Sequence, residues 1–154
     1  MDILLLFYKK YKGEVEPVDY INWALKMLEN NHFSFSINIL SSLREPLNIF
    51  EIEDYFRRAL KELDLQEPLY EECAEYYIWY LSKQILKDKE NALDIAYGIY
   101  KVVDYPENLA EWFNISEMID DFRYGDNYLN LDKAALITII MKEAQNQLER
   151  SNRK

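Results

Sequence analysis

The sequence predicts an all-α protein, an irregular bundle of about six or seven helices. Apolar residues recur at helical spacing in at least five segments. The chain has only 3 Gly and 4 Pro, and these turn residues are too few for the many short strands of a sandwich or barrel. Its 154 residues are an ordinary length for one domain. We therefore expect a single helical domain over residues 1–154, with a frayed tail at about 151–154.

Start and stop residues mark the individual helices. Glu-Pro pairs at 16–17, 45–46 and 67–68 are each predicted to precede a helix. Ser34 and Asn48 are suited to be N-caps. Apolar spacing predicts helices over about 18–30, 69–86 and 131–149. Leu60, in the helix behind Asn48, and Tyr77 are expected to face inward. The first twelve residues fit a buried strand or a short helix equally well.

The charge balance excludes several classes of partner. With 18 basic and 28 acidic residues the net charge is -10, so the surface repels nucleic acid and anionic membranes and favours a basic protein. No apolar stretch approaches the roughly 18 residues that span a bilayer. The apolar run of six residues at 3–8 follows an acid, so we expect no signal peptide. The single Cys73 forms no internal disulfide, and we expect a cytoplasmic protein.

The segment 104–132 combines acidic and aromatic residues. It holds eight acids against one base, Arg123, together with several rings. Carboxylates that attract a basic partner and rings that anchor it suit a protein-binding surface. The alternative is a solvated acidic face whose rings turn inward. On the first hypothesis the partner-binding residues are Trp112, Glu117, Asp120, Asp121, Tyr124 and Asp126.

Residues 48–60 (NIFEIEDYFRRAL) and 120–127 (DDFRYGDN) resemble small, acidic, all-helical bacterial proteins that include immunity proteins of polymorphic toxin systems. That resemblance implies a non-enzymatic protein that binds and neutralises a toxin, without cofactor or metal. A second resemblance, to MazG-like nucleotide pyrophosphohydrolases, rests on EExxE at 71–75 and ExxD at 117–120. It implies a magnesium site formed by Glu71, Glu72, Glu75, Glu117 and Asp120.

Three functional hypotheses follow, and the binding protein leads. The metal-dependent hydrolase is the alternative, although acids just after Pro68 also suit the start of a helix. A homodimer that buries spare aromatic rings is the third. Catalysis by a nucleophile and a base is disfavoured, because the only histidine, His32, lies between two predicted helices.

Overall fold

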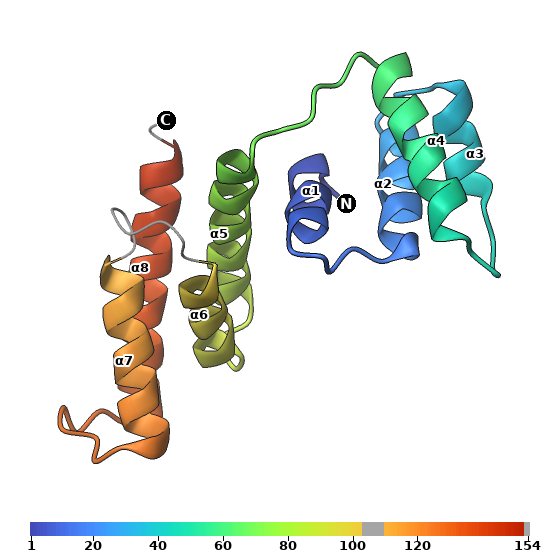
Figure 1. Ribbon diagram of the computed structural model, residues 1–154. Coiled ribbons are helices and arrows are strands. Elements are labelled where there is room, and N and C mark those ends of the chain that lie inside the picture. The colour runs from blue at the N-terminus through green and yellow to red at the C-terminus, as the bar shows by residue number, and fades with distance from the viewer. Residues whose placement is uncertain (103–109, 153–154) are drawn as a thin grey trace. The chain divides into compact units, whose positions relative to one another are not determined.

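The computed structural model describes residues 1–102 and 110–152, and every regular element in these ranges is an α-helix (Figure 1). The all-α prediction is confirmed. The described ranges contain eight helices where we expected six or seven. The additional one is α1 (Ile3–Tyr11), in the segment that fitted strand or helix, and the Asp2 carboxylate accepts from the Leu4 N–H at 2.8 Å to cap it.

The chain divides into two compact units, Met1–Ala74 and Glu75–Lys154. Unit 1 contains α1, the beginning of α5 and three complete helices: α2 (Pro17–Glu29), α3 (Phe35–Ser42) and α4 (Ile49–Glu62). Unit 2 contains the rest of α5 (Tyr70–Lys87), with α6 (Ala92–Lys101), α7 (Ala110–Tyr124) and α8 (Lys133–Asn152). The boundary falls within a helix, and the single-domain expectation stays a prediction. None of the helices in the described ranges is both long and apolar enough to cross a bilayer.

The predicted helix starts are partly correct. Pro17 is the first residue of α2, Ser34 accepts from Ile37 N–H at 3.1 Å, and Asn48 accepts from Phe50 N–H at 2.9 Å. The start predicted at residues 45–46 is wrong. The helix α4 begins only behind Asn48, because that side chain supplies the acceptor that the first N–H groups need.

Three helices of unit 1 end in the same way. Gly13, Asn31 and Asp64 follow α1, α2 and α4, with φ of 69°, 62° and 51°. In each case the next residue donates its N–H back into the last helical turn, as Leu65 does to the Leu60 carbonyl at 2.8 Å. This is the Schellman motif, which needs a left-handed residue after the helix. It turns the chain sharply and satisfies carbonyls that would otherwise lack partners.

The core of unit 1 is built around Phe56 of α4. Its ring centroid lies 5.6 Å from that of Phe7 and 5.0 Å from those of Tyr20 and Trp23. All four side chains are at most 1% exposed. Because these rings come from α1, α2 and α4, one side chain joins three helices. Leu60, which we expected inward, is only half-buried because it lies one position off this face.

The core of unit 2 consists of Trp112 and mainly branched aliphatic side chains, among them Ile115, Ile119 and Ile140. Tyr77, predicted inward, is half-buried, because α5 buries Ile78 beside it instead. The fraying expected at about 151–154 stays a prediction. The helix α8 continues through Asn152, and the Ser151 hydroxyl donates to the Gln147 carbonyl at 3.0 Å. Residues 153–154 lie outside the described ranges.

We expect Phe56→Ala to lower the free energy of unfolding by about 3 to 5 kcal/mol, because it opens a cavity between three helices. Leu60→Ala, at the half-buried neighbouring position, should cost clearly less. Urea denaturation of both variants measures the difference. Equal losses would contradict the packing described here.

A carboxylate also joins α4 to α3. Glu62, at the end of α4, accepts from the Ser36 backbone N–H at 2.8 Å and from the Ser36 hydroxyl. Ser36 lies in the first turn of α3, so Glu62 satisfies an N–H that has no partner within the helix. The two hydrogen bonds from Ser36 hold the pKa of Glu62 below its ordinary value of 4.5.

This lowered pKa predicts a pH-dependent contribution to stability. The folded protein binds the Glu62 proton more weakly than the unfolded chain does, so the contribution is present above pH 4.5 and disappears as the pH falls through the folded pKa. We expect wild type to exceed Glu62→Gln in stability near neutral pH, and the difference to shrink on acidification. Denaturation curves across pH measure it. Glu14→Gln, at an exposed position outside any helix, is the control, and an equal effect there would contradict the assignment.

Candidate functional site

The helix α7 separates buried from exposed residues of the predicted partner-binding segment. Its buried side includes Ile115, Ile119 and Trp112, which is 0% exposed. Glu117 and Asp120 are exposed. The prediction that Trp112 is available to a partner is therefore wrong, because the ring lies on the same helical face as the two isoleucines and packs inward with them. Residues 104–109 of the segment lie outside the described ranges.

The Trp112 indole takes part in a polar network with α8. Its Nε1–H donates to Gln147 Oε1 at 3.3 Å, and Arg150 donates to the same oxygen at 2.8 Å. Arg150 also forms an ion pair with Glu143, whose side chain is 9% exposed. A carboxylate removed from water to this extent requires such a partner. The network holds α7 against α8, which is a structural role.

Asp121 organises the loop that joins α7 to α8, residues 125–132, which we call the α7–α8 loop. Its two carboxylate oxygens accept from the backbone N–H groups of Asn127, at 3.2 Å, and Tyr128, at 2.9 Å. The Asn127 side chain in turn bonds both backbone groups of Leu131, at 2.9 and 3.1 Å. A Cβ on Gly125 would come within 2.6 Å of the Asp121 carboxylate. The loop therefore has a defined path that depends on Asp121 and on a glycine at 125.

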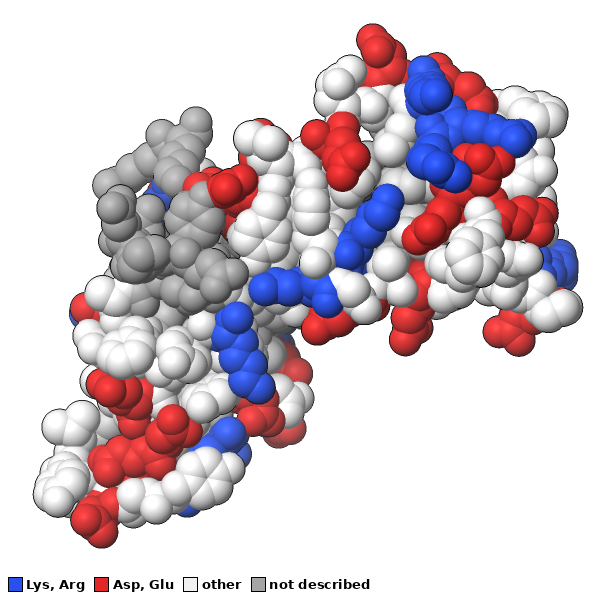
Figure 2. All heavy atoms as spheres, in the orientation of Figure 1, with Lys and Arg blue, Asp and Glu red and all other residues white. Residues whose placement is uncertain are grey.

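This ordered loop presents apolar groups to solvent. Tyr124 is 83% exposed, Tyr128 is 86% exposed and Leu129 is 60% exposed. Asp126, between the two tyrosines, is also exposed. Figure 2 shows acidic atoms gathered at the lower left, over the end of α7 and the loop. We call Glu117, Asp120, Tyr124, Asp126, Tyr128 and Leu129 the loop surface.

Helical spacing along α7 places two exposed acids on the same face as Tyr124. Glu117, Asp120 and Tyr124 follow one another at spacings of three and four residues, so they form one stripe on the helix. The Tyr97 hydroxyl of α6 donates to Asp120 at 3.4 Å, and the Asp120 charge is the main cause that raises the pKa of Tyr97 above its ordinary value of 10.0. Both groups stay exposed to water, where such a contact is weak.

The single base of the segment does not neutralise the stripe. Arg123 forms an ion pair at 2.7 Å with Asp94 of α6. Within the described ranges Glu117 and Asp126 form no ion pair. The loop surface consequently keeps a net negative charge.

Two carboxylates of the hydrolase hypothesis, Glu72 and Asp120, accept hydrogen bonds from neighbouring groups. Glu72 accepts a hydrogen bond from the Leu69 N–H at 3.1 Å, at the start of α5. Asp120 accepts one from the Tyr97 hydroxyl. In the part of the chain that the structure describes, no three His, Cys, Asp or Glu side chains lie where they could hold a metal ion together. No observation on these residues favours magnesium chemistry.

No protein-family model, curated protein or solved structure matches this chain. Its function is therefore inferred from its own residues.

The binding role of the segment stays a prediction, but sequence reasoning chose a ring that is buried. Trp112, Ile115 and Ile119 are spaced at i, i+3 and i+7, a pattern that predicts a buried face, and it should have placed Trp112 in the core. Sequence reasoning also missed Tyr128 and Leu129, which are exposed. Asn127 and Asn130, both with φ of 49°, are the available signal, since asparagine tolerates the left-handed turns that such a loop needs.

We expect Asp121→Ala to lower the free energy of unfolding by about 1 to 2 kcal/mol, because two loop N–H groups lose a charged acceptor. Amide hydrogen exchange at Asn127 and Tyr128 should also accelerate. Asp126→Ala is the matched control in the same loop and should stay within about 0.5 kcal/mol of wild type. Equal effects of the two variants would show that Asp121 does not hold the loop.

Proposed function

We propose that this chain is a non-enzymatic binding protein that holds a basic protein partner at the loop surface. The proposal is carried by one observation: Tyr128 and Leu129 are exposed on a loop whose backbone is tied by side-chain hydrogen bonds, and Tyr124 is exposed at the end of α7 beside this loop. Tyrosine anchors contribute much of the binding energy in protein interfaces. A loop that already has its bound shape loses little conformational entropy on association.

Other exposed rings lack this combination. Phe33, Phe35 and Phe50 of unit 1 are 62%, 72% and 81% exposed. Phe33 and Phe35 flank the start of α3, and Phe50 lies at the start of α4. A homodimer through such rings stays a prediction. At the loop surface, rings and unpaired carboxylates occur together, which supports a partner of opposite charge.

The concrete form of the proposal is an immunity-type role, in which the chain neutralises a toxin. Negative charge speeds association with a basic protein, and rapid capture is what neutralisation inside a cell requires. The support is the acidic, aromatic and ordered character of the loop surface together with the sequence resemblance of residues 48–60 and 120–127.

A growth assay tests this role. The gene product encoded next to this chain is expressed alone and together with it, and we expect growth arrest in the first case and its relief in the second. Arrest that persists on co-expression, or a neighbouring product that does not affect growth, would contradict the immunity role.

When the partner has been identified, variants of the loop surface should distinguish the effect of charge on binding from the effect of side-chain contact. We expect Asp120→Lys to slow association and weaken its dependence on salt, since long-range attraction acts on the association rate. Tyr128→Ala should instead speed dissociation and cost upwards of about 2 kcal/mol of binding energy. Surface plasmon resonance measures both rates. Glu90→Lys, an exposed acid of unit 2 outside the loop surface, is the charge control, and an equal effect there would show that only net charge matters.

A further inference from the structure

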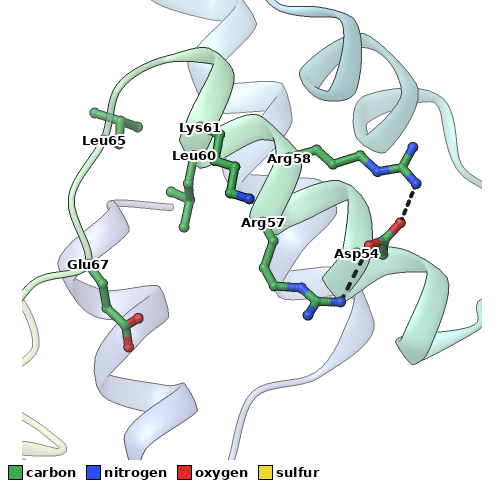
Figure 3. Close-up of a pocket in the computed structure, with 7 residues that line it drawn as sticks. All are labelled: Asp54, Arg57, Arg58, Leu60, Lys61, Leu65 and Glu67. Atoms are coloured by element: carbon green, nitrogen blue, oxygen red, sulfur yellow. Dashed lines mark hydrogen bonds and ion pairs between the residues drawn. The ribbon is translucent and has the colours of Figure 1, made fainter.

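A depression of about 440 Å³ lies at the end of α4, within unit 1 (Figure 3). Its volume falls in the range of about 300 to 1,000 Å³ that is usual for ligand sites. Leucines, three bases and two acids line it. The lining residues are Asp54, Arg57, Arg58, Leu60, Lys61, Leu65 and Glu67.

The apolar part of the depression is built by the way α4 ends. Asp64 adopts φ of 51°, its N–H bonds the Lys61 carbonyl at 3.2 Å, and the Leu65 N–H bonds the Leu60 carbonyl at 2.8 Å. A Schellman motif of this kind usually brings the two hydrophobic side chains at these positions together. Leu60 and Leu65 both line the depression and are only half-buried. They therefore offer an apolar surface that a ligand could cover.

Two bases beside these leucines are available to an anion. Arg57 and Lys61 are four residues apart, so they lie on one face of α4. Figure 3 shows Lys61 and Leu60 directed into the space between α4 and the segment that carries Glu67. The Lys61 side chain forms no ion pair or hydrogen bond with any residue that the structure describes. Arg57 contacts Asp54 at 3.4 Å, with side chains 68% and 45% exposed, and such a pair is weak.

The remaining charges define which anion fits. Arg58 approaches Asp54 at 2.7 Å and largely satisfies it. The lining therefore holds three bases against two carboxylates, those of Asp54 and Glu67, which leaves one net positive charge at this site on a chain of net charge -10. Glu67 would repel a doubly charged phosphate group more than a single carboxylate. Figure 2 shows the corresponding gathering of Lys and Arg atoms, over α4 at the upper right.

We infer that this depression binds an acidic peptide segment of a protein partner, with one carboxylate held between Arg57 and Lys61 and a neighbouring apolar side chain against Leu60 and Leu65. Carboxylate recognition by arginine is strong because the guanidinium offers paired donors. This site lies in unit 1 and attracts the opposite charge from the loop surface. It therefore stands independently of the proposed function.

Fluorescence anisotropy with three labelled octapeptides tests the inference. Each has a Gly-Ser background, and their central residues are Glu-Ser-Leu, Gln-Ser-Leu and Glu-Ser-Ser. We expect the first to bind the full chain and the other two to bind at least about tenfold more weakly, because a lost charge-assisted hydrogen bond or a lost leucine contact is worth that much. Binding of all three with equal affinity, or of none, would overturn the inference.

Variants locate the site on the protein. Lys61→Gln and Arg57→Gln should each lower the affinity for the Glu-Ser-Leu peptide about tenfold. Leu65→Ser should also lower this affinity, and it should reduce the difference in affinity between the Glu-Ser-Leu and Glu-Ser-Ser peptides. Arg44→Gln removes one exposed positive charge outside the depression and should leave binding unchanged. All four positions lie at or near the surface, so we expect each variant to fold. Thermal melts verify this. An equal loss with Arg44→Gln would overturn the inference, as would displacement of the peptide by inorganic phosphate at unchanged ionic strength.

Discussion

The structure depends on how the ends of its helices are satisfied. An α-helix leaves its first N–H groups without partners, and leaving one buried and unpaired costs about 1 to 3 kcal/mol. Short helices make this cost recur often along the chain. Polar side chains supply the acceptors: Asp2 for α1, Asp19 for α2, Ser34 for α3, Asn48 for α4, Glu72 for α5 and Asp132 for α8.

Much of the acidic composition therefore has a structural use. Asp19 shows this most fully, because its carboxylate is 7% exposed, accepts from the Glu16 N–H at 2.8 Å and pairs with Lys9 of α1 at 3.0 Å. Asp120 and Asp121 are neighbours in sequence but differ in role. The first faces water on the stripe of α7, and the second is bonded to the backbone of the loop. Net charge alone could not have separated the acids that hold the fold from those available to a partner.

The two surfaces with proposed binding roles are built on the same principle. At each one a helix ends, a non-glycine residue adopts a left-handed conformation, and the chain turns so that an apolar side chain is left accessible. Asp64 does this beside Leu65, and Asn127 does it beside Tyr128. In both cases hydrogen bonds close to the turn fix the backbone, so the accessible groups have defined positions before any ligand arrives. Such preorganisation reduces the ordering cost of binding.

The sequence alone determined what depends on neighbours within one helical turn. Ser34 and Asn48 cap helices because their oxygens reach N–H groups two or three residues ahead. Phe56 lies on the buried stripe of α4 because helical spacing places it beside Ile52 and Ala59. The all-α class follows from many such local choices.

Tertiary structure decided what depends on residues far apart in the chain. Trp112 and Gln147 are 35 positions apart, and only the packing of α7 on α8 brings the indole N–H to the Gln147 side chain. The depression at the end of α4 likewise exists because the chain turns back at Asp64 and carries Glu67 past Arg57 and Lys61. Local spacing sets which residues share a helical face. Which face meets another helix, and which faces water, is settled only when the helices pack, because the free energy of burial depends on the neighbours that packing supplies.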